Sequence, residues 1–518
     1  MCKEPIKILF LSATSAAFEW QNALVYYAPR EYTIYLNGDA VCTARTNVFS
    51  LFGLTPNKEY TLTCDLCDLS LTFRTPSETI AVSVREFGAK GDGVRDDTVA
   101  IQTAINCLPA GARLLFPSGT YLTSPICLKS HLTIEIAKDA VILGQTSKSA
   151  YPIIPAEVQG LRDEESLLCG TWEGNACRMY QSLFFAEHAE DITLIGPGTI
   201  DGNAQNGTWW SERKTDPVSR PRLLFFNRCR SIRIHGIQAM NAPSWHIHPY
   251  FSTEVRLIDV KVTAPEDSPN TDAIDPEACE CVDIIGCRLS VGDDCVAIKS
   301  GKIEIANKFH QPADRHTVRN CLMERGHGAI TLGSEISGGV KNLTVSQCLF
   351  EKTDRGIRTK TRRGRGESSR IDGLLFENLR MVGVLTPIVF NMWYNRCDPD
   401  RDSEYVYTRE SLPVDKRTPY LGAFTFRNLE CIDCEVCACY FDGLPEMPIQ
   451  SITLENILFA FCENARAGVP AMRAFIQPFL KSGMYFDNVK HLRIQNVKVE
   501  GVLGDQLLTH NVQHLIEE

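Results

Sequence analysis

Three aspartates in two short segments could perform acid–base chemistry: Asp272 in an NTD segment, and the adjacent pair Asp293 and Asp294 in GDDC. Carboxyl groups held close together push their pKa values apart, so that one can remain a general acid while another is an ionised base. Glycosidic bond hydrolysis uses such a pair. The alternative is that each is a turn aspartate that accepts hydrogen bonds from the backbone. Neighbouring side chains in a regular strand point to opposite faces, so both members of the pair can reach one site only if the backbone turns, which Gly292 permits.

Two further motifs follow at intervals of about one repeat. His327 lies between two glycines, which is a poor position for a core side chain but suits close approach to a backbone. Arg358 and Lys360 lie in the densest positive stretch of the chain, which also contains Arg363. Arginine and lysine bind carboxylates well, so this stretch favours an acidic sugar as substrate. A solvated charged loop is the alternative.

The elements that must position these residues repeat from about residue 130 onwards. Short runs rich in β-branched residues alternate with Asn, Asp or Gly turns, as in DITLIGPGTIDG, CVDIIGCRLSVG and SITLENILFA. The spacing of roughly 22 to 40 residues is typical of stacked coils with variable loops. The runs are continuous rather than alternating, which indicates parallel strands buried in a stack. We predict an all-β fold built on a right-handed parallel β-helix, in which the motifs above lie on one wall.

The first 77 residues have a different pattern. Short alternating runs separated by Gly, Asn and Pro predict a small antiparallel β-sandwich, and Tyr60 follows a turn in the position of a tyrosine corner. This segment resembles a fibronectin type III domain. We therefore expect two domains, residues 1–77 and 78–518, with 78–125 as a cap region. In the cap, a helix at 98–108 would begin at Asp96 or Asp97 and bury an apolar face that includes Val99.

Composition limits the partners and the compartment. The 518 residues carry a formal net charge of −10 and no long basic run, which argues against nucleic acid or an anionic membrane surface as partner. No apolar run is long enough to span a membrane. The N-terminal apolar run is too short for a clear signal peptide, and the 21 cysteines are then expected to be reduced, buried thiols. We expect a cytoplasmic protein, with a secreted or periplasmic location as the alternative.

The order NTD, GDD, GHG and RTK on successive repeats resembles glycoside hydrolase family 28, the polygalacturonases and their relatives. The similarity runs from FGAKGDG, which begins at Phe87, through GTIDG and SWHIHP to beyond residue 365. It implies inverting hydrolysis of α-1,4-linked galacturonan, with acid and base roughly 6.5–9.5 Å apart. By position, Asp293 resembles the general acid, Asp272 and Asp294 the pair that activates water, and His327 the residue that tunes the acid. Arg358 and Lys360 resemble the grip on the substrate carboxylate.

Three residues next to these motifs differ from the family pattern, and several other residues are candidates for substrate or metal binding. Ala273, Gly292 and Thr359 stand where the family often has Gly, Gln and an aliphatic residue, and none of these changes removes a charged group. Trp393 and Tyr394 would form either a sugar-stacking platform or part of the core. The cysteines from 431 to 439 lack the spacing of two zinc-binding turns, so we expect no metal and no other cofactor. Further substrate-binding candidates are His248, Arg222, Glu335, Lys299 and Arg363.

The resemblance favours exo-action, that is, release of galacturonic acid from the non-reducing end of oligogalacturonides. It rests on the front module and on the GSE segment followed by SGG, residues 333–339, with the loop-rich stretch 145–190 as a candidate wall at one end of the site. The expected partner is an oligo- or polysaccharide that contains galacturonic acid. Alternatives are hydrolysis of rhamnogalacturonan or xylogalacturonan, or a non-catalytic polysaccharide-binding β-helix. The sequence indicates no oligomeric state.

Overall fold

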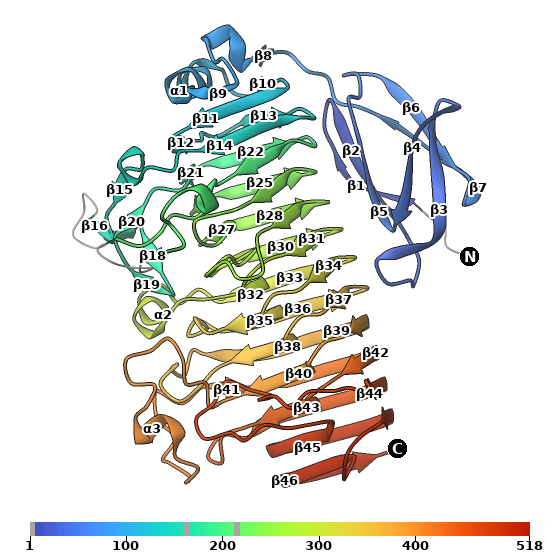
Figure 1. The fold of residues 1–518 in the computed structure, drawn as a ribbon, viewed down its shortest axis with the longest axis vertical. Coiled ribbons are helices and arrows are strands. Elements are labelled where there is room, and N and C mark those ends of the chain that lie inside the picture. Colours follow the sequence, from blue (N-terminus) through green and yellow to red (C-terminus); the bar gives the residue numbers. More distant parts are fainter. Residues whose placement is uncertain (1–5, 160–165, 212–217) are drawn as a thin grey trace.

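The computed structural model describes residues 6–159, 166–211 and 218–518. Most of the chain winds as a right-handed parallel β-helix, and a small antiparallel β-sandwich lies along one side of it (Figure 1). No helix among these residues is long and apolar enough to cross a membrane. The predicted fold class is confirmed.

Three ladders of parallel strands make up the helix, and most coils contribute a short strand to each ladder. The first ladder contains β10 (Ala112–Phe116), β13 (Leu132–Ile136), β22 (Glu190–Ile195), β25 (Arg230–His235), β28 (Thr253–Ile258), β30 (Glu280–Ile285), β33 (Ala313–Arg319) and β36 (Val340–Ser346). The second contains β11 (Gly119–Thr123), β14 (Ala140–Gly144), β23 (Thr199–Asp201), β26 (Gln238–Met240), β29 (Lys261–Thr263), β31 (Arg288–Ser290), β34 (Leu322–Glu324) and β37 (Leu349–Glu351).

The third ladder, which we call the site ladder, carries the predicted chemistry. Its strands are β12 (Ile126–Cys127), β21 (Phe184–Glu187), β24 (Leu224–Asn227), β27 (Ile247–Tyr250), β32 (Asp294–Ile298), β35 (Gly328–Gly333), β38 (Arg355–Lys360), β40 (Thr386–Asn391) and β43 (Cys437–Asp442). Between β27 and β32, one coil joins the ladder only through single bridges at Ile274 and Glu277. Side chains at alternate positions point inwards and form one apolar core through the stack.

In the last coils, the strands of the first two ladders merge into long bent strands. These are β39 (Arg370–Val382), β42 (Ala423–Cys434), β44 (Ile449–Phe461) and β45 (Ser482–Glu500), followed by β46 (Leu507–Glu517). At the bends, asparagines adopt positive φ and donate side-chain hydrogen bonds from coil to coil, from Asn496 through Asn456 and Asn428 to Asn378. Asparagine tolerates this conformation better than other residues with a Cβ, which explains its recurrence in the turns.

The helix α1 (Thr98–Cys107) lies over the first coil, near β8 (Ala81–Ser83) and β9 (Asp92–Asp96), at the top of Figure 1. The helix was predicted, but two details differ. Val99 is 79% exposed, so the buried face consists of Ile101, Ala104 and Ile105. Asp97 precedes the helix without capping it: its carboxylate accepts hydrogen bonds from backbone N–H groups before β9, while Asp96 accepts the Thr98 N–H.

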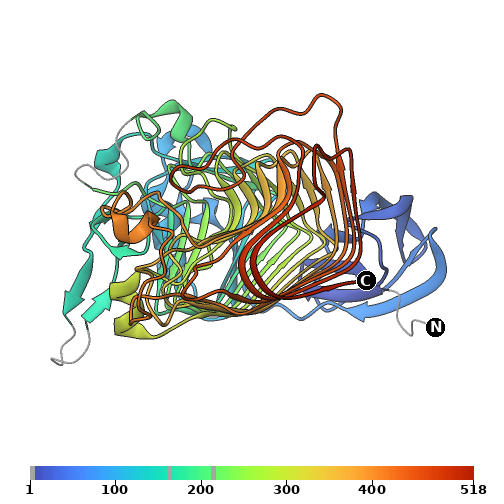
Figure 2. The same ribbon diagram turned by 90° about the horizontal axis from the view of Figure 1, so that it is seen from below.

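The β-sandwich contains two antiparallel sheets of the order β1-β2-β5 and β4-β3-β6-β7. Tyr60 makes the contact expected of a tyrosine corner, since its hydroxyl accepts a hydrogen bond from Thr55 N at 2.9 Å. Figure 2, which looks along the stack, shows the sandwich on the side away from α3 (Glu404–Tyr407). Its strands are β1 (Ile6–Leu11), β2 (Ser15–Trp20), β3 (Tyr27–Leu36), β4 (Asp39–Thr46), β5 (Val48–Phe52), β6 (Glu59–Cys64) and β7 (Cys67–Arg74).

Candidate active site

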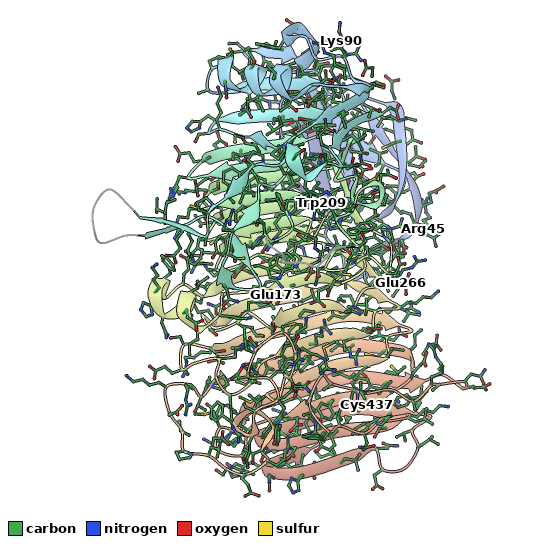
Figure 3. The ribbon with its side chains drawn as sticks, turned by 60° about the vertical axis from the view of Figure 1, so that its left-hand side comes forward. Arg45, Lys90, Glu173, Trp209, Glu266 and Cys437 are labelled. Carbon is green, nitrogen blue, oxygen red and sulfur yellow. The ribbon has the colours of Figure 1, made fainter. Side chains whose placement is uncertain are left out.

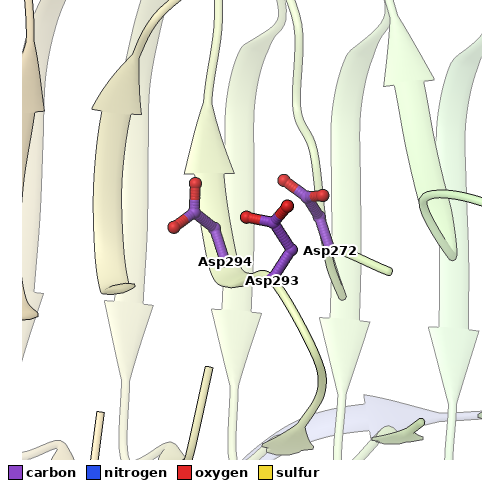
Figure 4. A group of neighbouring side chains, drawn as sticks. All are labelled: Asp272, Asp293 and Asp294. Atoms are coloured by element: carbon purple, nitrogen blue, oxygen red, sulfur yellow. The ribbon is translucent and has the colours of Figure 1, made fainter. Parts of the chain in front are cut away.

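The three predicted aspartates meet on the outer face of the site ladder (Figure 4). Asp294 begins β32, Asp293 precedes it, and Asp272 lies one coil earlier. One oxygen from each carboxylate lies within 4.8 Å of the others. Asp272 and Asp294 are buried, whereas Asp293 is half-buried and faces solvent.

Glycines allow this close arrangement, although not in the way that was expected. Gly292 does not adopt positive φ; instead, a Cβ at this position would collide with backbone oxygens of the preceding loop, including that of Ser268. Gly328 has a similar role one coil later, since a Cβ there would lie 2.9 Å from Arg358 Nε and 3.0 Å from Asp294 Oδ1. Both glycines therefore leave room for the site rather than turn the chain.

Asp294 is held as an ionised carboxylate. Arg358 donates to its Oδ1 at 2.5 Å and Lys360 to its Oδ2 at 2.7 Å. Burial alone would raise the pKa of Asp294, but the two cations outweigh burial and hold that pKa below its ordinary value. Both cations come from β38, so the RTK motif, which was expected to bind the substrate carboxylate, also binds the carboxylate of Asp294.

Asp272 lies in the opposite electrostatic environment. Burial, together with the nearby charges of Asp275 and Asp293, raises the pKa of Asp272 well above its ordinary value. Its nearest cation is Lys299, whose Nζ is 3.8 Å from Oδ2. The pKa values of Asp272 and Asp294 are therefore shifted in opposite directions, and carboxyl groups with pKa values pushed apart are suited to acid–base chemistry.

Lys299 is surrounded by carboxylates. Its Nζ lies 3.3 Å from Asp275, 3.4 Å from Glu335 and 3.8 Å from Asp272. Burial raises the pKa of Asp275 to about 7, against the opposing effect of Lys299. Burial would also raise the pKa of Glu335, but Lys299 and Lys302 lower it to about 2. Lys299 and Glu335, predicted to bind substrate, thus lie at the site but belong to a buried ion-pair network.

His327 begins the next coil and is half exposed. Its Nδ1 is 2.8 Å from Asp354 Oδ2, and its backbone N–H donates to Asp293 O at 3.1 Å. The hydrogen bond to Asp354 raises the pKa of His327, burial opposes this, and the charges of Asp293 and Asp294 add to it. His327 therefore lies beside the exposed aspartate, as its predicted role requires.

His248 and Arg222 lie behind the site, with no exposed surface. His248 Nε2 is 3.1 Å from Glu277 Oε2, and its ring contacts Trp245. The Arg222 guanidinium lies between Trp172 and Trp245, 4.7 and 4.1 Å from the ring centres. Both were expected to bind substrate, but both are packed in the interior and can affect substrate only through the residues in front of them.

Arg363 was expected to bind substrate, and the structure contradicts this. Its side chain is 1% exposed, donates to both oxygens of Glu446 and also donates to backbone carbonyls at Tyr405, Thr408 and Glu410. It therefore anchors the loop around α3. Within the basic stretch, Arg358 and Lys360 face the aspartates, whereas Arg362 and Arg365 pair with Asp398 of the same loop.

Trp393 and Tyr394 are buried, with 3% and 4% exposure, so they belong to the core rather than to a sugar-stacking platform. Trp393 packs beneath Arg363 and Arg409, at 4.8 and 4.0 Å from its ring centre. The four cysteines between 431 and 439 are also buried, and none of the cysteines that the structure describes forms a disulfide.

Two segments pack against the site ladder near the aspartates. The hairpin of β18 (Thr171–Trp172) and β19 (Asn175–Ala176) brings Gly174 against Glu335 and the backbone of Lys302. Glu173, at the tip of this hairpin, is labelled in Figure 3. The loop at 462–481 places Ala471 in one apolar cluster with Val389, the ladder neighbour of Arg358.

The spacing of the carboxylates differs from the predicted separation. One oxygen of each carboxylate lies within 4.8 Å of the others, and this distance between single oxygens is shorter than the roughly 6.5–9.5 Å expected between the acid and base carboxyl groups of an inverting enzyme. Such a group of oxygens could also bridge a cation, but Arg358, Lys360 and Lys299 already place three positive charges against it. The geometry supports acid–base chemistry.

The family model for glycosyl hydrolases family 28 matches residues 132–404, more than half of the chain, including the three aspartates, His327, Arg358 and Lys360. The chain belongs to this family. A second model, rhamnogalacturonase A/epimerase, pectate lyase-like, matches residues 81–163 at the start of the stack.

Individual relatives agree with the family assignment. A probable polygalacturonase from Vitis vinifera is 29% identical over 398 residues, covering 74% of this chain and 75% of that one. An exopolygalacturonase from Arabidopsis thaliana is 28% identical over 325 residues, covering 60% and 66%. The solved structure of a family 28 exopolygalacturonase from Yersinia enterocolitica has the same fold, with a TM-score of 0.70, 17% identity and 98% coverage of both chains. The protein is thus a glycoside hydrolase of the polygalacturonase type.

Three site residues were missed by sequence reasoning: Asp275, Glu277 and Asp354. A signal for two of them was present, because Asp275 follows Asp272 by three residues and Glu277 by five, within the NTD coil. The strand register of the ladder would have placed Glu277 beside Lys299, with which it forms a backbone β-bridge. Asp354 lies directly before β38, and no motif in the sequence marked it as a site residue.

Proposed function

We propose that the protein hydrolyses α-1,4-galacturonosidic bonds, releases galacturonic acid from the non-reducing end of oligogalacturonides and inverts the anomeric configuration. The observation that carries the proposal is the contact of Arg358 and Lys360 with a carboxylate within the aspartate cluster. Cations that already bind a carboxylate in this geometry are suited to bind the carboxylate of a galacturonate residue.

The reaction needs one aspartate to give a proton and another to take one up. Asp293, the least buried of the three, gives a proton to the glycosidic oxygen as the bond to C1 breaks. Asp294, which the two cations keep ionised, removes a proton from the water that attacks C1, and Asp272 helps to hold this water. The products are two sugars with free hydroxyl groups, and the enzyme regains its starting state when a proton returns from Asp294 to Asp293 through solvent.

Exo-action is supported by the two segments that lie over the site ladder and by the resemblance to exo-acting relatives. The hairpin at 171–176 contacts Glu335, and the loop at 462–481 packs against the ladder one coil beyond Arg358. Segments that cover the ladder this close to the aspartates favour a substrate that enters as a chain end over one that lies across the site.

The test of exo-action is a product time course on trigalacturonate and polygalacturonate. Galacturonic acid as the first and dominant product from both substrates supports the proposal. A ladder of oligomers from polygalacturonate would contradict exo-action, and cleavage of only another pectic backbone, such as rhamnogalacturonan or xylogalacturonan, would contradict the substrate. Proton NMR of the first product separates the stereochemistries: β-galacturonic acid is expected, and the α-anomer would contradict inversion.

A further inference from the structure

We propose that Asp354 is a positioning residue for His327: it orients the imidazole ring, keeps it in the protonated form and so sets the pH range of the reaction. This inference rests on the proposed function for its kinetic consequences, but its structural part concerns only two side chains. Asp354 lies at the end of the loop before β38, and His327 lies just before β35, so the contact joins adjacent coils.

The geometry of the contact gives His327 one defined orientation. Asp354 Oδ2 lies 2.8 Å from Nδ1, a length typical of a charge-assisted hydrogen bond from an imidazolium to a carboxylate. Since Nδ1 is engaged with Asp354, Nε2 is the nitrogen left for Asp293, whose backbone carbonyl already accepts the His327 N–H. A histidine with one nitrogen fixed by a carboxylate has its tautomer and ring orientation set by that partner.

Asp354 is itself held from its other side. Arg355 NH1 lies 3.6 Å from Asp354 Oδ2, and the remaining donors of Arg355 reach the backbone carbonyls of Val469 at 2.6 Å and Pro470 at 3.4 Å. The Arg355 side chain is buried, so the pair is not a loose surface contact. The loop at 462–481 is thereby linked to His327 through Arg355 and Asp354.

The charged groups around His327 favour its protonated form. Asp293 and Asp294 face it from the start of β32, and Asp354 faces it from the coil of β38, whereas burial opposes the protonated form. Against the effect of burial, Arg355 and Arg358 of the same coil as Asp354 lower the pKa of Asp354. The hydrogen bond to Asp354 is the largest contribution and is the one that a single substitution removes with little change in volume. The other two carboxylates are part of the reacting cluster and cannot be altered without altering the chemistry.

The direct test is an NMR titration of the His327 C2–H resonance, assigned with His327→Gln, in wild type and Asp354→Asn. We expect the midpoint of His327 to move to lower pH in Asp354→Asn by about one unit and to return in Asp354→Glu. An unchanged midpoint in Asp354→Asn would overturn the proposal, whether or not the protein cleaves any pectic substrate. Because the titration needs no substrate, it tests the contact of Asp354 with His327 independently of the proposed function.

The kinetic test uses kcat/KM on trigalacturonate as a function of pH. In Asp354→Asn, the alkaline limb is expected to move to lower pH with the His327 midpoint, and kcat at the optimum to fall about tenfold. The matched control is Asp283→Asn, because Asp283 is also 39% exposed and also pairs with an arginine, but lies on the first ladder. A uniform fall in activity without a shift of the alkaline limb would show a merely structural role and contradict the proposal.

Discussion

Three residues of one type acquire different chemical roles from their neighbours. Asp294 lies between Arg358 and Lys360, Asp272 lies among other buried carboxylates, and Asp293 is half-buried. Residue type alone made the three aspartates equivalent in the sequence, and only the resemblance to a family distinguished their roles. The cations that lower the pKa of Asp294 lie 64 and 66 positions away in the chain, and only the coil register brings them to it.

Replacing Lys360 tests the cause of the low pKa of Asp294. In Lys360→Met, one of the two cations is lost, so the pKa of Asp294 rises towards its ordinary value. The acid limb of the kcat/KM profile is then expected to move to higher pH by about one unit, with a higher KM for trigalacturonate. Lys341→Met, at a half-exposed lysine outside the site, serves as control. An acid limb that stays in place would show that Lys360 does not control the base.

Glu277 gives a prediction on stability. Burial and the nearby charge of Glu335 raise its pKa to about 8. A carboxyl group with a raised folded-state pKa binds its proton more tightly in the folded state, so the free energy of unfolding falls as pH rises from about 5 to 8. In Glu277→Gln, the fall in Tm across this range is expected to be smaller than in wild type. The same Tm slope in both proteins, measured by differential scanning calorimetry, would contradict the assignment.

At the scale of elements, the site depends on one ladder in which equivalent positions of successive coils lie side by side. Glu277, Lys299, Gly333, Lys360 and Asn391 form one such row. The repeat and the four motifs could be read from the sequence because strands and turns follow local patterns. The partners of each motif could not be read from the sequence. Loops of different length separate the coils, so the sequence does not show which positions of successive strands pair.

Arg363 is a residue for which the sequence context predicted the wrong contact. Its place in a basic stretch suggested substrate binding, but the chain turns after Lys360 and places it under the loop around α3. Removal of one partner from a buried ion pair leaves an unpaired charge and costs about 3–5 kcal/mol. Arg363→Met is therefore expected to lower Tm by several degrees while the folded fraction keeps its KM. A higher KM without loss of stability would restore the substrate-binding role.

At the scale of the whole molecule, the β-sandwich is fixed to the side of the helix by buried polar contacts. Arg319 donates to both oxygens of Glu19, at 2.6 and 2.8 Å, and Asn320 donates to the same carboxylate. Two coils earlier, Ser50 donates to Asp259, and an apolar cluster joins Val48 to Ile258 and Ile285. These contacts make the sandwich a brace for the coils next to the site rather than a tethered module.

The brace predicts cooperative unfolding. Glu19→Ala leaves Arg319 without its partner and is expected to destabilise sandwich and helix together, with one calorimetric transition at lower Tm. Glu59→Ala, an exposed position on the outer sheet of the sandwich, is the control and should leave Tm nearly unchanged. A separate low-temperature transition for the sandwich, with the main transition unmoved, would contradict the brace.

The central claim is that the aspartate cluster hydrolyses galacturonan with Asp293 as the acid. The most direct measurement compares wild type and Asp293→Asn on trigalacturonate, with saturated and unsaturated products distinguished by mass. We expect saturated products from wild type and a loss of about 10²- to 10⁴-fold in kcat for the variant, with Tm nearly unchanged. Wild-type activity in Asp293→Asn, or unsaturated products from either protein, would contradict the account.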